Sequence, residues 1–239
     1  MQNLTICLTF YIKCVIMKKV NEYVEPFALI ITYTEENIMN VMDIIMEKKI
    51  VPVVVLNNLE DTEPTLNALC EGGLPIAEIT FRTACAADAI KLGVEKFPNM
   101  LIGAGTVINE EQAEKAIACG SKFIVGPGFS AKVAAVCRKH GIPYLPGCVT
   151  PTEIIAAIDE GIEIVKFFPA SDFGGLKAIK SLAAAFPAMK FLPTGGISDA
   201  NVLEYLAFPK IVACGGSWMM KGTPDEIKEK TAKAMELVK

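Results

Sequence analysis

Residues 76–104 carry the pattern that decides the fold and read IAEITFRTACAADAIKLGVEKFPNMLIGA. The short apolar runs Ile76–Phe81 and Leu101–Ala104 predict two strands, and the apolar spacing over 84–96 predicts a helix between them. A strand, a helix and a second strand within about 30 residues are typical of a βαβ unit, whose strands pair in parallel. The stretch therefore indicates an α/β protein with a parallel sheet.

The same alternation extends in both directions from this unit. After an opening helix at 41–48, strands are predicted at 50–55, 76–81, 101–104, 123–125, 144–145, 164–167, 190–193 and 211–214. Helices are predicted at 62–71, 84–96, 110–118, 131–140, 151–159, 175–185, 201–206 and 224–238. Eight strand–helix units in about 200 residues fit a compact (β/α)₈ TIM barrel. We therefore predict one TIM-barrel domain over 39–239, with an open doubly wound sheet as the alternative fold.

The composition describes a globular chain without a strong electrostatic field. Of its 239 residues, 52% are hydrophobic and 21% are charged, which excludes a disordered chain. The formal net charge of -4 offers no attraction for nucleic acid or for an anionic membrane surface, so neither partner is expected. An anionic ligand must instead be held by a local site of backbone amides and one or two cations.

Cysteine and histidine usage argues against a metal site. The 8 cysteines form no C-x-x-C pair, and we interpret them as reduced thiols of a cytoplasmic protein. The single histidine, His140, follows two cationic residues and precedes Gly141, where a helix would end. We therefore predict a helix-end role for His140 and no metal ligands.

The first forty residues differ from the rest of the chain. Residues 1–20 are apolar but are interrupted by polar and cationic side chains. This pattern is not typical of a signal peptide, and the apolar run is not continuous enough for a membrane-spanning helix. The codons of Glu35 and Glu36 are purine-rich enough to serve as a ribosome-binding sequence ahead of Met39. We predict that the native protein starts at Met39 and that residues 1–38 are a non-native or disordered extension. A genuine extension that packs on the barrel is the alternative.

The second predicted strand places charged side chains where a barrel enzyme has its active site, at the C-terminal ends of the strands. Alternation along 76–83 puts Glu78, Thr80 and Arg82 on one face and the apolar residues on the other, toward the helices. An unpaired charge in the barrel mouth destabilises the fold, and such a residue usually has a catalytic or binding role. Glu78 and Arg82 are therefore candidate functional residues, with a buried ion pair between them as the alternative.

The sixth predicted strand carries a candidate nucleophile. Lys166 shares its face with Ile164 and Phe168, so its amine points into an apolar interior. Desolvation favours the neutral amine, which can attack a carbonyl carbon to form a Schiff base. The alternative is a lysine that reaches solvent or pairs with Glu78.

Glycine-rich stretches end three of the predicted strands, at 103–106, 194–198 and 214–218. The last two follow strands seven and eight, where TIM barrels frequently build a phosphate site from loop amides and a helix N-terminus. Tight turns also need glycine. Two Gly-Gly pairs at these two strands nevertheless favour a phosphate site.

These stretches together resemble the bacterial 2-keto-3-deoxy-6-phosphogluconate (KDPG) and 4-hydroxy-2-oxoglutarate (KHG) aldolase family. The motifs occur in the family's order and are EITFRT at 78–83, GAGTV at 103–107, KFFPA at 166–170, PTGGI at 193–197 and GGSW at 215–218. The resemblance runs from about Val41 to the C-terminus, and the N-terminal extension has no counterpart in the family.

The resemblance implies a class I aldolase on a TIM barrel that needs no metal or cofactor and is usually a cytoplasmic homotrimer. Such an enzyme cleaves KDPG to pyruvate and glyceraldehyde 3-phosphate, and some members also cleave KHG to pyruvate and glyoxylate. A relative that acts on the phosphogalactonate epimer shares the barrel, the lysine and the glutamate. That activity, a metal-dependent or non-covalent phosphate-binding barrel enzyme, and a sugar-phosphate sensor are the alternatives.

The resemblance also implies a role for each motif residue. Lys166 would form the Schiff base with the C2 carbonyl of the keto acid, and Glu78 would be the general acid/base. The pyruvate carboxylate would be held by Arg82 and Thr106. The remaining substrate contacts would come from Pro127 and Phe168 around the pyruvyl group, Thr194 near the hydroxyls, and Gly195, Gly196, Gly215 and Ser217 around the phosphate.

Overall fold

The structure, a computed structural model, describes residues 41–239. The predicted start at Met39 and the predicted extension over 1–38 lie outside the described residues. The described part opens with a helix over 41–48, as the sequence predicts. None of the helices in this part of the chain is long and apolar enough to cross a membrane.

Strands and helices alternate through the described chain. The strands are β1 Ile50–Val54, β2 Ile76–Thr80, β3 Leu101–Gly105, β4 Ile124–Val125, β5 Tyr144–Leu145, β6 Ile164–Phe167, β7 Lys190–Pro193 and β8 Cys214–Gly216. The helices are η1 Leu59–Asp61 (a 3₁₀ turn), α2 Thr62–Glu71, α3 Ala86–Lys96, α4 Glu110–Ala118, α5 Ala131–His140, α6 Pro151–Asp159, α7 Gly175–Ala185, α8 Val202–Leu206 and α9 Pro224–Leu237.

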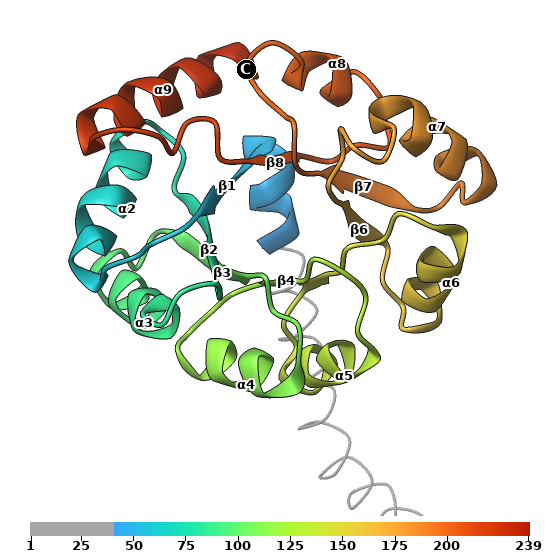
Figure 1. Ribbon diagram of the computed structural model, residues 1–239, viewed down its shortest axis with the longest axis horizontal. Helices are drawn as coiled ribbons and strands as arrows, with labels where there is room; N and C mark the ends of the chain where they lie inside the picture. Colours follow the sequence, from blue (N-terminus) through green and yellow to red (C-terminus); the bar gives the residue numbers. More distant parts are fainter. Residues whose placement is uncertain (1–40) are drawn as a thin grey trace, which may run out of the picture. The chain divides into compact units, whose positions relative to one another are not determined.

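The strands close into a ring. β5-β4-β3-β2-β1-β8 form one sheet and β6-β7 a second, and every strand pair is parallel. Parallel bridges between Gly147 and Lys166 and between Thr194 and Gly215 join the two sheets at both edges. The helices α2 to α9 surround this ring, whereas the opening helix over 41–48 lies within it in the view of Figure 1. The predicted TIM barrel is confirmed, and the open doubly wound sheet is excluded.

The strand register assigns a face to each side chain. Glu78 on β2 lies opposite Val53 of β1 and Gly103 of β3. Its neighbours Ala77 and Ile79 are fully buried in an apolar cluster that includes residues of α2 and α3. The predicted alternation along β2 is therefore confirmed, with the apolar face toward the helices.

The predicted position of the last strand is wrong, because β8 spans Cys214–Gly216 and not 211–214. Ile211 makes only an isolated bridge to Phe191, whereas Gly215 pairs with Val51 of β1. The apolar residues that predict the strand begin at Ile211, ahead of the residues Cys214–Gly216 that pair with β1. Gly215 sits where a Cβ would collide with the Thr194 hydroxyl, so the pairing needs a residue without a side chain.

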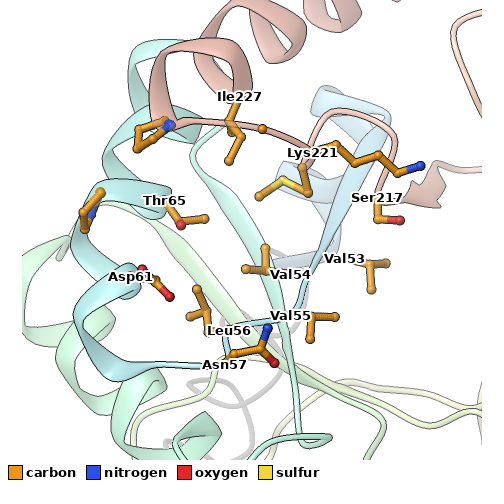
Figure 2. A pocket seen from close by; sticks show the side chains of 14 residues that line it. Val53, Val54, Val55, Leu56, Asn57, Asp61, Thr65, Ser217, Lys221 and Ile227 are labelled. Carbon is orange, nitrogen blue, oxygen red and sulfur yellow. The ribbon is translucent and has the colours of Figure 1, made fainter.

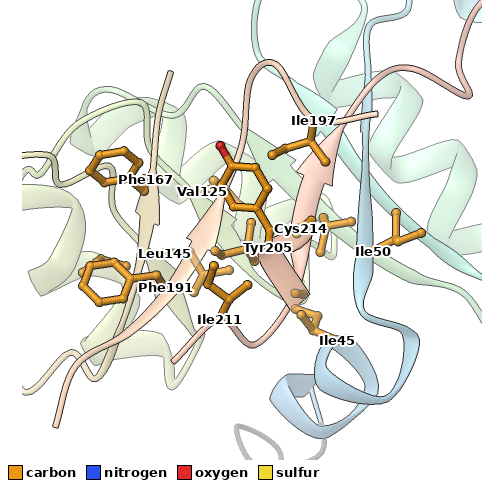
Figure 3. Packing of buried hydrophobic residues seen from close by; sticks show 14 of the residues in the cluster. Ile45, Ile50, Val125, Leu145, Phe167, Phe191, Ile197, Tyr205, Ile211 and Cys214 are labelled. Atoms are coloured by element: carbon orange, nitrogen blue, oxygen red, sulfur yellow. The ribbon is translucent and has the colours of Figure 1, made fainter. Parts of the chain in front are cut away.

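The core closes one end of the barrel. Val41 and Ile45 of the opening helix share an apolar cluster with Ile50, Ile76 and Leu101, the first residues of β1, β2 and β3. The same cluster includes Phe167, Phe191, Tyr205 and Cys214, which are among the buried side chains that Figure 3 shows. Because the opening helix covers the N-terminal ends of the strands, a ligand site is expected at their C-terminal ends.

Candidate active site

A cavity of about 430 Å³ lies at the C-terminal ends of the strands. Its wall comes from β1, β6 and β8 and from the segments that follow β2, β6, β7 and β8. The lining residues are Val53, Arg82, Lys166, Phe168, Thr194, Gly195, Gly196, Ile197, Ser198, Gly216, Ser217, Trp218 and Lys221. Seven of the eleven residues predicted for the site are in this set: Arg82, Lys166, Phe168, Thr194, Gly195, Gly196 and Ser217.

Lys166 and Glu78 form a buried ion pair in the barrel. The two residues are 4% and 1% exposed, and Lys166 Nζ donates to Glu78 Oε1 at 3.1 Å and to Oε2 at 3.4 Å. The carboxylate offsets the cost of burying the ammonium. Lys166 thus does not reach solvent, and its predicted alternative contact with Glu78 is present. The alternative ion pair between Glu78 and Arg82 is not found in the described residues.

The surrounding backbone makes room for this pair. A Cβ at Gly105 on β3 would collide with the Glu78 carboxylate, so glycine is required at that position. On the other side, Gly147 pairs with Lys166, and the Lys166 Nζ lies 5.3 Å from the centre of the Phe168 ring. This distance is within the range of a cation–π interaction.

Arg82 is held by a strained neighbour. Its Nε donates to Thr106 Oγ1 at 2.9 Å. Thr106 has a φ of 58°, in the left-handed region that β-branched residues rarely occupy, and such conformations concentrate at functional sites. Because Nε makes this bond, the two terminal amino groups of Arg82 remain for a planar anion such as a carboxylate.

The loops after β7 and β8 present backbone donors to the cavity. Gly195 and Gly196 have φ values of 93° and 75°, and a Cβ at Gly196 would collide with the Ser171 side chain. In the part of the chain that the structure describes, the N–H groups of Gly195, Gly196 and Ser217 donate no hydrogen bond. Unpartnered amides grouped at a cavity wall are suited to an anion such as a phosphate.

Comparison with known proteins places this geometry in a family. The family profile described as KDPG and KHG aldolase matches residues 41–236, which is most of the chain. The chain belongs to this aldolase family. The 2-dehydro-3-deoxy-phosphogluconate aldolase of Treponema pallidum (strain Nichols) is 46% identical over 172 residues, which cover 72% of this chain and 82% of that protein.

Solved aldolase structures share the barrel. The 2-keto-3-deoxy-6-phosphogluconate aldolase of Zymomonas mobilis ZM4, crystallised with 3-phosphoglycerate, superposes with a TM-score of 0.79 at 33% identity and covers 84% of this chain and 97% of that one. The KDPG aldolase of Legionella pneumophila, with pyruvate captured as a covalent carbinolamine intermediate, has a TM-score of 0.75 at 36% identity, covering 82% and 95%.

Four of the residues predicted from the aldolase motifs are not in the cavity wall. Glu78 and Thr106 lie behind it, in contact with Lys166 and Arg82 respectively. Pro127 lies against Gly147, where its carbonyl would collide with an added Cβ. Gly215 pairs with the backbone of Thr194, and its neighbour Gly216 takes the place in the wall.

Sequence reasoning missed several lining residues of this aldolase: Val53, Ile197, Ser198, Gly216, Trp218 and Lys221. For Lys221, a signal was present, since this cation follows the glycine-rich end of the last strand by a few residues. The anion site expected there needs one or two cations, and Lys221 meets that need by its position in the sequence.

The remaining chemistry-bearing residues lie apart from the cavity. His140 ends α5, and its Nε2 lies 2.8 Å from Glu114 Oε2, so the predicted helix-end position is confirmed. Within residues 41–239, no group of three or more His, Cys, Asp or Glu side chains is arranged to hold a metal. The six described cysteines are free, and burial raises the pKa of Cys137, Cys148 and Cys214 to about 12.

Proposed function

We propose that this protein is a class I, Schiff-base aldolase that cleaves KDPG to pyruvate and glyceraldehyde 3-phosphate, and KHG to pyruvate and glyoxylate. The observation that carries the proposal is the buried contact of Lys166 with Glu78 beside a cavity that also exposes unpartnered amides. The aldolase names of the relatives support the same reaction.

The buried pair can supply both the nucleophile and the proton transfers. Glu78 takes a proton from the Lys166 ammonium across the 3.1 Å contact, and the neutral amine attacks the C2 carbonyl of the keto acid. Protonated Glu78 then gives this proton to the carbinolamine hydroxyl, which leaves as water, so that a protonated imine forms and the Glu78 carboxylate is restored. Glu78 is then the base nearest to the imine and the candidate to remove the C4 hydroxyl proton, directly or through a water.

Cleavage follows from the imine. The C3–C4 bond breaks, its electron pair moves into the imine to form an enamine, and the aldehyde leaves. Glu78 returns the proton to C3 of the enamine, and hydrolysis of the imine releases pyruvate and regenerates Lys166. Each proton taken by Glu78 is thus returned within one turnover.

Two anion sites in the cavity wall would orient the substrate. The terminal amino groups of Arg82 pair with the carboxylate next to the reacting carbonyl, and Thr106 holds the guanidinium in place. The amides of Gly195, Gly196 and Ser217, which also line the cavity, receive the phosphate. Thr194 also lines the cavity and is the candidate contact for the substrate hydroxyls.

The decisive experiment traps the imine. The protein is incubated with pyruvate and borohydride, and the intact mass and a peptide map are recorded. We expect a pyruvyl-sized increment on Lys166, absent in Lys166→Arg and retained in Lys91→Arg, which changes an exposed lysine of α3. A folded protein without an adduct would exclude the Schiff-base mechanism and favour a non-covalent barrel enzyme.

Turnover assays separate the remaining alternatives. Cleavage of KDPG faster than of its phosphogalactonate epimer supports the proposed substrate, and the reverse order supports the epimer. Loss of activity with a chelator would indicate a metal-dependent aldolase. Binding of phosphorylated acids with no turnover of any of them would indicate a sensor.

We also propose that the enzyme works in the cytoplasm as a homotrimer. The free thiols support a reducing compartment. The exposed apolar side chains of Ile155, Ile158 and Phe173 support a surface that other copies cover. Sedimentation velocity of the wild type and of Ile155→Lys tests the assembly, since a trimer that depends on this surface dissociates in the variant.

A further inference from the structure

Lys221 stands at the boundary between two cavities. A second cavity, of about 390 Å³, is formed by the segment after β1, the start of α2 and the loop before α9. It shares Val53, Ser217 and Lys221 with the cavity that contains Lys166. Figure 2 shows the Lys221 side chain extending toward the side of Ser217 and away from Asp61.

The loop that carries Lys221 is anchored on both sides. The Met220 amide donates to the Ser217 carbonyl at 3.1 Å, and Lys230 of α9 donates to the Lys221 carbonyl at 2.5 Å. Thr223 then begins α9 with a capping box, in which its side chain and that of Glu226 satisfy backbone N–H groups. The backbone of Lys221 is therefore fixed, and only its side chain needs to find a partner.

Lys221 is the cation of the active-site cavity that has no partner among the described residues and can therefore neutralise a bound anion. No aspartate or glutamate lines this cavity, and its other two cations are Lys166, paired with Glu78, and Arg82, bonded to Thr106. Lys221 forms no ion pair with any residue between 41 and 239. The nearby Asp199 is bound by Trp218 and Lys233 and so is already partnered.

The second cavity offers a weaker site for the same ammonium. Asp61 lines it and accepts a hydrogen bond from Asn58 at 3.1 Å. The active-site cavity, in contrast, holds the unpartnered amides of Gly195, Gly196 and Ser217, which attract an anion and with it a counter-cation. The net charge of -4 gives such a ligand no general attraction, so a local cation would favour its binding.

We propose that Lys221 is a specificity-determining residue that pairs with the terminal phosphate of the substrate and favours phosphorylated over uncharged aldehydes. The proposal rests on the aldolase function proposed above. Its amine acts as a point charge on a flexible stem, which suits a phosphate held mainly by backbone amides. Lys221 takes no part in the hydrogen bonds of the Lys166–Glu78 pair, so we assign its effect to binding of the phosphate and not to the chemistry of the imine.

The test uses two aldehydes that differ only in the phosphate. Addition of pyruvate to glyceraldehyde 3-phosphate and to glyceraldehyde is measured for the wild type, Lys221→Met, Lys221→Arg and Lys91→Met, a matched exposed lysine on α3. In Lys221→Met we expect the ratio of the two kcat/KM values to fall about 3- to 10-fold, the range between an exposed ion pair and a charge-assisted hydrogen bond. The change should lie in KM.

The controls distinguish an effect of the Lys221 charge from misfolding of the variant and from failure of the proposed aldolase function. Lys221→Arg and Lys91→Met should keep the ratio within about 2-fold, and 0.5 M salt should lower the wild-type ratio more than that of Lys221→Met. An unchanged ratio in Lys221→Met, with wild-type activity on both aldehydes, overturns the role of Lys221 alone. A wild type that adds pyruvate to neither aldehyde overturns the proposed function instead.

Discussion

The side chains of Lys166 and Glu78 neutralise each other where solvent hardly reaches, at 5% and 1% exposure. Removing one member of such a pair leaves an unpaired buried charge, which typically costs about 3–5 kcal/mol of stability. An informative variant therefore keeps the shape and the hydrogen bonding of the lost group. Gln meets that condition at position 78.

Glu78→Gln should leave imine formation with pyruvate partly intact and slow KDPG cleavage by about 10²- to 10⁴-fold, because the amide cannot take the C4 hydroxyl proton. The measurements are single-turnover cleavage and borohydride trapping on the same preparation, with thermal unfolding to verify that the variant is folded. Turnover at the wild-type rate would remove Glu78 from the acid/base role.

Ser217→Ala keeps the backbone amide but removes the side-chain hydroxyl, a further donor at the cavity wall. It should raise the KM for KDPG several-fold while changing the KM for KHG little, because only KDPG carries the phosphate. Ser217 lines the cavity beside Gly216, whereas Ser181 is exposed on α7 and bonds its own helix at Lys177. Ser181→Ala is therefore the matched control. Equal increases for the two substrates in Ser217→Ala would argue against a phosphate contact.

At the scale of the elements, glycines on the strands decide which side chains can fill the barrel. Gly103 of β3 faces the interior, where a Cβ would collide with the ring of Phe123 from the adjacent part of the barrel. Phe123 is fully buried and has no free space to move into. The ring of Phe123 thus fills the space that Gly103 leaves by having no side chain.

Gly103→Ala should destabilise the protein by about 1–3 kcal/mol through overpacking, which corresponds to a fall in Tm of roughly 2–10 °C for a chain of this size. Gly128→Ala is the control, since Gly128 has open space around its Cα and a φ that alanine accepts. Thermal unfolding of both variants gives the comparison. Equal Tm values would show that the barrel relaxes around the extra methyl group.

At the scale of the whole domain, the first and last helices of the ring pack against each other and complete the outer layer. Gly72 at the end of α2 lies so close to α9 that a Cβ would collide with Thr231. Glu71 adds an ion pair across the same junction, with its Oε2 2.7 Å from Lys228 Nζ. The hydrogen bond from Lys228 lowers the pKa of Glu71, and the same bond raises the pKa of Lys228.

This pair predicts a pH-dependent stability. The contribution of Glu71, whose pKa is lowered in the folded state, is present above its ordinary value of 4.5 and is lost as the pH falls through the lowered value. The contribution of Lys228 is present below 10.5 and is lost as the pH rises through its raised value. Between these limits the pair is fully formed.

Glu71→Gln should therefore lower Tm slightly at pH 7, and the difference from the wild type should disappear in acid and in 1 M salt, since the pair is exposed. Glu95→Gln, an exposed carboxylate of α3, is the control and should leave Tm unchanged. Tm measured from pH 2 to 8 checks the prediction. A difference that persists at low pH would assign the effect to packing.

Local patterns in the sequence predicted much of this molecule. The bounds of β5, β6 and β7 and of α2, α4, α5, α6 and α7 agree with the structure, because alternation and capping residues act over a few neighbouring positions. The inward orientation of Glu78 and Lys166 also follows from alternation within a single strand. These properties depend on residues close together in the chain.

The pairing partners of these side chains depend on how the whole chain folds. Glu78 pairs with Lys166, 88 residues away, and not with Arg82 four positions on, which instead bonds Thr106. The position of β8 depends on its ladder with β1, and the place of Lys221 depends on the loop between β8 and α9. Alternation specifies a face of a strand, whereas contacts across the barrel depend on how eight strands close into a ring, which no local pattern encodes.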